Sequence, residues 1–167
     1  MVRSIQFQHR SLSTPPAKLV DQALRQFVGY HLKRTYNVVR ADLSRQLEPL
    51  GLRITTYSCL LLVIENPGVR QSELAQALDI ERPNMVNILD ELEKRGWITR
   101  EQIPTDRRAY ALTGTASGER VCKQAVTVDK QHEARLLEKL TDKQVAKLIE
   151  ALEKIESAQE DSSDDVA

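Results

Sequence analysis

Apolar residues recur at steps of three and four along most of this 167-residue chain, a period typical of helices that bury one face. One segment departs from this period. Two short runs, 97–101 and 109–112, flank a polar and basic stretch that contains Asp106, Arg107 and Arg108, which is typical of a β-hairpin. The sequence therefore predicts a mainly α-helical fold with one small hairpin, its only strand-like region.

Length and composition are those of one folded domain, since 41% hydrophobic residues can supply a core. The longest apolar run, 59–64, is far shorter than the roughly 20 residues that cross a bilayer. The N-terminus lacks the continuous apolar segment of a secretion signal. We therefore expect a cytoplasmic protein with no membrane segment.

Charge alone does not indicate a partner. The 24 basic residues balance 24 acidic ones, but Glu160, Asp161, Asp164 and Asp165 lie in a tail without Lys or Arg, so residues 1–158 carry a charge of +4. Proteins that bind nucleic acid usually have a stronger basic surplus. The functional argument must therefore come from the order of residues.

The apolar period and its breaks give the order of the elements. A long amphipathic helix is predicted from about Ala17 to Leu50, after an arm with Pro15 and Pro16. Shorter helices follow at about 55–64, 69–80 and 83–95, then the hairpin. Two more helices are expected, one to about Leu140 and one from a capping box at Thr141 and Gln144 to Ser157.

Two short helices joined by a tight turn and followed by a basic hairpin can place the second helix in the major groove of DNA. Apolar residues on that helix would face the core, and its polar residues would face solvent. Asn can pair with adenine and Arg with guanine, so Arg82, Asn84 and Asn87 are candidate base-reading residues. Gln71 and Ser72 could hold phosphate at the start of the first short helix.

The chain resembles the MarR family of bacterial transcription regulators over roughly residues 18–157. The residues that carry the resemblance are 71–75, 81–86, 89–98, Asp106-Arg107-Arg108 and Leu112-Thr113. The resemblance implies a homodimer of winged helix-turn-helix subunits on a palindromic operator, with half-sites about 34 Å apart. It also implies contacts to DNA by Pro83 and by the wing residues Asp106, Arg107 and Arg108. Two positions depart from the family pattern. Asn87 stands where a basic residue is expected, and Asn84 stands where Thr or Ser is usual.

The resemblance divides the chain into five segments. They are an N-terminal arm (1–17), a dimerisation helix (18–54), a winged helix-turn-helix lobe (55–113), C-terminal dimerisation helices (114–157) and an acidic tail (158–167) that is expected to be disordered.

The resemblance further implies a repressor that a small aromatic acid, phenol or aromatic acyl-CoA releases from DNA. Tyrosine rings can stack on such a ligand, and arginines can bind an anionic group. The candidate residues are Tyr30, Arg34, Tyr36, Arg40 and Tyr57. Ordinary packing and solvated charge remain the alternative for each of them.

Other functions are less favoured by the residues. The sequence has no phosphate-binding loop, catalytic motif or metal-ligand spacing, so we expect no enzyme activity, cofactor or metal. Oxidant sensing stays an alternative, but Cys59 lies in an apolar run that would raise its pKa. A winged-helix scaffold for protein partners is the other alternative, although it would not need the exposed Arg and Asn residues.

Overall fold

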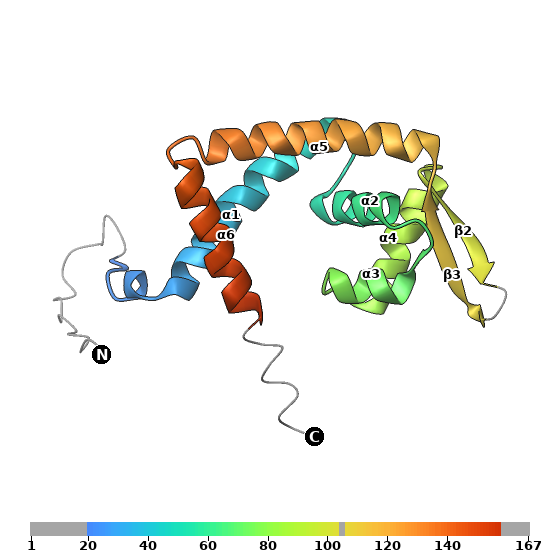
Figure 1. The fold of residues 1–167 in the computed structure, drawn as a ribbon, viewed down its shortest axis with the longest axis horizontal. Coiled ribbons are helices and arrows are strands. Elements are labelled where there is room, and N and C mark those ends of the chain that lie inside the picture. The colour runs from blue at the N-terminus through green and yellow to red at the C-terminus, as the bar shows by residue number, and fades with distance from the viewer. Residues whose placement is uncertain (1–19, 104–105, 158–167) are drawn as a thin grey trace, which may run out of the picture. The chain divides into compact units, whose positions relative to one another are not determined.

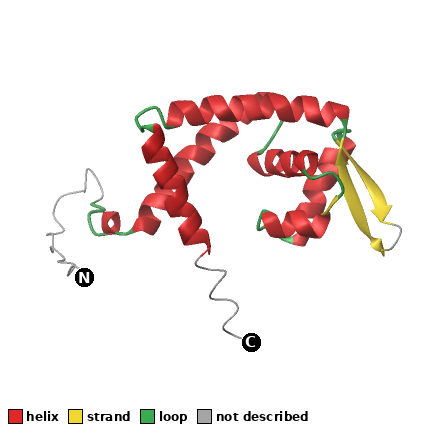
Figure 2. Ribbon diagram, viewed as in Figure 1, coloured by secondary structure: helices red, strands yellow, loops and turns green. Residues whose placement is uncertain are grey.

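The structure is a computed structural model that describes residues 20–103 and 106–157, with the backbone alone at 106–109. The predicted arm and acidic tail lie outside the described residues. The chain divides into two compact units, Met1–Ala41 and Asp42–Ala167, and each is described by itself. Figure 1 shows the elements in chain order, and Figure 2 shows that strands occur in one place only among them.

The first unit holds a short 3-10 turn, η1 (Leu24–Gln26), and most of α1 (Val28–Leu47). The predicted continuous helix from Ala17 is wrong at its start, because Phe27 is extended, with φ −104° and ψ 131°. Side chains support this break: Asp21 accepts hydrogen bonds from Arg25 at 2.8 Å and from Tyr30 at 2.6 Å. A periodicity argument follows apolar residues, so it does not predict these local polar contacts.

The second unit is built around α2 (Ile54–Glu65), which is apolar on nearly all sides and is covered by α3 (Gln71–Ala77) and α4 (Arg82–Lys94). Leu60 and Val63 of α2, Leu74 of α3 and Leu89 of α4 are fully buried together. This cluster confirms the predicted inward face of α4, since Met85, Ile88, Leu89 and Leu92 are all buried.

The sheet has three antiparallel strands in the order β1 (Val69–Arg70), β3 (Asp106–Gly114), β2 (Ile98–Ile103). The hairpin of β2 and β3 was predicted, but the statement that it is the only strand-like region is wrong. Val69 pairs with Leu112 and Arg70 with Ala111. A strand of two residues is too short to show alternation, and its pairing with β3 is a tertiary contact.

Two helices complete the chain, α5 (Ala116–Leu136) and α6 (Asp142–Ser157). α5 ends about four residues before the predicted Leu140, because residues 137–140 form a turn. The capping box at the start of α6 is confirmed, since Thr141 N–H donates to Gln144 Oε1 at 2.9 Å and Gln144 N–H to Thr141 Oγ1 at 3.4 Å.

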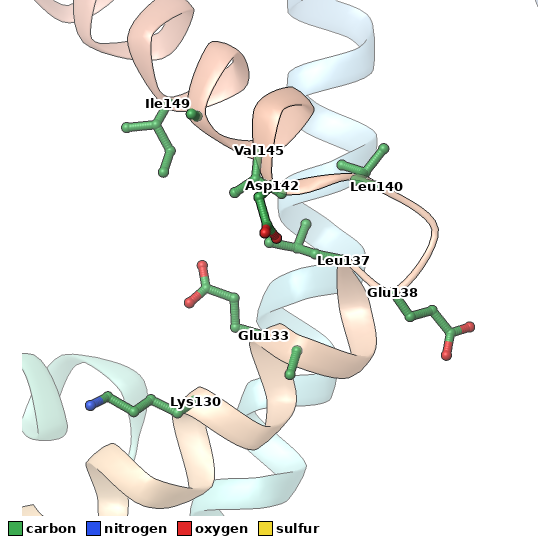
Figure 3. Close-up of a pocket in the computed structure, with 10 residues that line it drawn as sticks. Lys130, Glu133, Leu137, Glu138, Leu140, Asp142, Val145 and Ile149 are labelled. Atoms are coloured by element: carbon green, nitrogen blue, oxygen red, sulfur yellow. The ribbon is translucent and has the colours of Figure 1, made fainter.

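A groove of about 660 Å³ lies between α5 and α6. Figure 3 shows that its apolar side chains come from the turn after α5, at Leu137 and Leu140, and from α6, at Val145 and Ile149. Lys130, Glu133 and Glu138 also line the groove. Leu148 and Ile155 of α6 are about half exposed, at 45% and 51%.

No single helix among the described residues is long and apolar enough to cross a membrane. The pair 28–50 and 54–65 meets that test only when combined across a 70° bend. Since α2 supplies the buried core of the second unit, its apolar composition has a structural explanation.

Candidate DNA interface

The tight turn between α3 and α4 is formed by residues 78–81. Asp79 takes a left-handed conformation with φ 49°, which Asp and Asn tolerate better than most residues. Ile80 N–H donates to Ala75 O at 2.9 Å, which closes the turn on the end of α3. Pro83 lies in the first turn of α4, where its missing N–H costs nothing.

α4 is strongly two-sided. Met85, Leu89 and Leu92 on its inner face are fully buried. The predicted base-reading residues Arg82, Asn84 and Asn87 are all exposed, together with Pro83, and lie in its first half. The structure therefore brings the four candidates of α4 to the free side of one helix.

The start of α3 is less open than the sequence suggested. Glu73 accepts a hydrogen bond from Arg70 N–H at 2.7 Å, so a carboxylate already caps this end. Gln71 is half-buried and Ser72 is exposed. Phosphate contact by Gln71 and Ser72 stays a prediction.

The wing is attached to α4 by an arginine that the sequence did not single out. Arg100 of β2 pairs with Asp90 and, at 3.2 Å, with Glu93, and its side chain is 17% exposed. Both carboxylates belong to α4, so these ion pairs join β2 of the wing to α4. Asp106, Arg107 and Arg108 lie at the start of β3, and their side chains lie outside the described part.

The other end of α4 is joined to the start of α2. Glu91 pairs with Arg53, which precedes α2, and with Arg95 at 2.9 Å. Arg95 also donates to Gly51 O at 2.9 Å and lies 4.8 Å from the ring centre of Trp97. These contacts join the second half of α4 to the segment that precedes α2.

The candidate effector residues are divided between the two units. Tyr30 and Arg34 lie together in the first unit, where Arg34 donates to the Tyr30 hydroxyl at 3.3 Å. Tyr36 and Arg40 are exposed on α1. Tyr57 belongs to the second unit and is buried in its core.

Polar groups cluster around Tyr57 where α2, α5 and the last turns of α1 meet. Tyr57 donates to Asp129 Oδ2 at 3.1 Å, and burial, followed by the negative charge of Asp129, raises the pKa of the phenol. His132, one turn further along α5, pairs with Asp42 at 2.8 Å. His132 lowers the pKa of the Asp42 carboxyl, as does Arg45. No motif in the sequence marked Asp42, Asp129 or His132 as a group, because they are far apart along the chain.

Cys59 and Cys122 are buried and do not form a disulfide bond. Burial raises the pKa of the Cys59 thiol to about 11, and burial also raises the pKa of Cys122. Cys59 lies 3.8 Å from the sulfur of Met85 in the core. Thiols that are protonated and covered in this way react slowly with oxidants.

Comparison with known proteins agrees with this geometry. The model of the MarR family matches residues 52–110. An HTH-type transcriptional repressor of Mycobacterium tuberculosis is 33% identical over 130 residues, which are 78% of this chain and 94% of the repressor.

Two solved structures are similar over most of the chain. The transcriptional repressor CouR bound to a 23-mer DNA duplex has a TM-score of 0.79 and 36% identity, covering 83% of this chain and 99% of that one. CouR from Rhodococcus jostii RHA1 bound to p-coumaroyl-CoA has a TM-score of 0.73 and 32% identity, covering 80% and 94%.

The three-stranded wing, the two-sided α4 and the helices around them define a winged helix-turn-helix regulator, not an enzyme. The chain belongs to the MarR family of transcriptional regulators.

Proposed function

We propose that this chain is a sequence-specific repressor that binds a palindromic operator as a homodimer and leaves it when a small aromatic effector binds. The observation that carries the proposal is the free face of α4. Arg82, Asn84 and Asn87 lie exposed on a helix whose opposite face is locked in the core. Such side chains can reach base edges in the major groove without disturbing the packing.

The attachment of the wing supports the same proposal. Arg100 holds β2 against Asp90 and Glu93 of α4, so the wing and the recognition helix would meet DNA as one unit. Phosphate and minor-groove contacts by Asp106, Arg107 and Arg108 would then fix the register of α4 on the duplex.

Exposed apolar side chains on α1 and α6 support dimerisation. On α6, Leu148, Ile149 and Ile155 are 45%, 49% and 51% exposed, and on α1, Val28 and Val38 are 64% and 59% exposed. Apolar surfaces of this kind on helices are typical of association sites. A second copy of the chain is the partner that a palindromic operator requires.

The effector is proposed from the relatives and from the cluster around Tyr57. A similar repressor binds p-coumaroyl-CoA. Tyr57, Asp129, His132 and Asp42 bring polar groups into an otherwise apolar junction of three helices. A ligand there would act by preferring the state in which the two recognition helices no longer fit the half-sites.

A mobility-shift titration against the chain's own upstream intergenic DNA tests the function. It is run at two salt concentrations with non-specific competitor DNA. Salt-sensitive binding that resists the competitor is expected. Binding that the competitor removes completely would contradict sequence-specific recognition and favour the scaffold alternative. Addition of peroxide should leave the shift unchanged, since release by peroxide would favour oxidant sensing.

A further inference from the structure

One exposed side chain of α4 is apolar and comes from a residue that is unusual on a helix surface. Val86 is 39% exposed. Within α4, all of whose residues the structure describes, the other exposed residues apart from Pro83 are charged or carry an amide. Valine is also less favourable in a helix than these longer residues, because its branched side chain loses rotamers there. Val86 therefore exposes an isopropyl group to water without stabilising the helix.

Val86 lies in the row of α4 that is joined to the wing. Positions 86, 90 and 93 follow one another at steps of four and three, so their side chains lie on one side of the helix. Arg100 of β2 pairs with Asp90 and Glu93 in the second half of this row. Val86 is one turn nearer the start of α4 and stays exposed. It therefore lies in the half of the helix that carries the candidate base-reading residues, on the side of the wing.

The chemistry of the side chain limits which part of a DNA duplex it can recognise. An isopropyl group has no hydrogen-bond donor or acceptor, so it binds neither a phosphate oxygen nor the polar groups of a base edge. The apolar group that base edges present in the major groove is the C5 methyl of thymine. Contact between this methyl and Val86 would remove both apolar groups from water.

We propose that Val86 contacts the C5 methyl of one thymine in each half-site of the operator and so determines a preference for thymine at that position. The inference rests on the proposed function, because it requires α4 to lie in the major groove of a specific operator. It adds an apolar contact to the hydrogen bonds that Arg82, Asn84 and Asn87 are proposed to make.

The test replaces thymine with deoxyuridine, which lacks the C5 methyl and keeps every hydrogen-bonding group of the base. Full-length protein is titrated with the upstream intergenic duplex that it binds in the mobility-shift experiment. Each thymine of the operator is replaced in turn, together with its symmetry mate in the other half-site. One such pair of replacements should weaken binding about fifteen-fold, since each buried methyl contributes about a factor of four.

Two variants separate contact with Val86 from other effects of the methyl. In Val86→Ala the loss of affinity caused by deoxyuridine at the sensitive position should fall to within about two-fold, because the isopropyl group is gone. Lys94→Ala, a truncation to the same residue in the last turn of α4, is the matched control and should keep the full loss. Alanine favours a helix and both positions are exposed, so both variants should fold, which circular dichroism verifies.

Two results would overturn the inference while the wild-type protein still binds the unmodified operator specifically. One is that no replacement by deoxyuridine weakens binding by more than about two-fold. The other is that the full loss persists in Val86→Ala, which would assign the effect of the methyl to DNA shape or to another residue. Either result leaves the proposed function intact. If the wild-type protein binds no operator specifically, the proposed function is refuted, and this inference with it.

Discussion

Asn87 is exposed on α4, and its amide can pair with adenine in the major groove. Asn87→Ala should lose about 1–3 kcal/mol of discrimination at one base position in each half-site. Binding to a set of operators with single base changes measures this. Lys94→Ala, at the far end of the same helix, is the control and should keep all preferences. A uniform loss of affinity for every operator would mean that Asn87 does not read a base.

Arg108 has a different expected role, because we propose that the wing contacts the DNA backbone or the minor groove. Arg108→Ala should weaken binding to all operators similarly and reduce the slope of log K against log salt by about 1. Titrations at several salt concentrations measure the slope. Arg120→Ala, which removes an exposed charge from α5, should leave the slope unchanged. An unaltered slope in Arg108→Ala would remove this residue from the interface.

Among the described glycines, Gly118 at the start of α5 has the closest neighbouring atom. A Cβ atom at Gly118 would lie 2.1 Å from the backbone oxygen of Trp97, which cannot move without displacing β2. Gly118→Ala should therefore lower the free energy of unfolding by about 1–3 kcal/mol or more. Urea denaturation measures this loss.

Gly29 provides the matched control for that substitution. It lies in α1 and a Cβ there would meet nothing within 4 Å. Because Ala favours a helix over Gly, Gly29→Ala should raise stability by up to about 1 kcal/mol. If Gly118→Ala leaves the free energy of unfolding unchanged or raises it, as Gly29→Ala should, the close approach of α5 to Trp97 is contradicted.

The junction of α1 and α5 should depend on pH through Asp42. The hydrogen bond from His132, and then that from Arg45, hold the pKa of this carboxyl below its ordinary value. The folded state therefore favours the ionised form, and this contribution is complete above about pH 4 and is lost as the pH falls through the folded-state pKa. The stability difference between wild type and Asp42→Asn should shrink below about pH 4.

Denaturation at a series of pH values from neutral to acid measures this difference. Glu138→Gln, which removes an exposed negative charge in the turn after α5, is the charge-matched control. A difference that grows as the pH falls below about 4 would mean that the carboxylate is not the favoured form in the folded junction.

For the whole molecule, the exposed apolar residues of α6 should decide assembly. Leu148 is 45% exposed on α6, the helix whose Val145 and Ile149 line the groove to α5. Leu148→Gln should shift the protein from dimer to monomer at micromolar concentration and weaken operator binding, because a monomer holds only one half-site. Sedimentation velocity measures the assembly. Lys147→Gln, the adjacent exposed position, should remain dimeric, and a dimeric Leu148→Gln would exclude this part of α6 from the interface.

The sequence by itself determined the helical fold with a wing, because the periods of three to four and of two reflect which local faces are buried. It also identified the buried face of α4 and its exposed Arg82, Asn84 and Asn87, since both sides of one helix can be read from spacing alone.

Only the tertiary structure decided which distant residues meet. Val69 and Arg70 form a strand because β3 is beside them, and Arg100 fixes the wing because Asp90 and Glu93 face it. Asp42 and His132 are 90 positions apart in the chain, so neither local propensity nor spacing could pair them. Such contacts depend on how helices pack in three dimensions, which a pattern of period three or four does not specify.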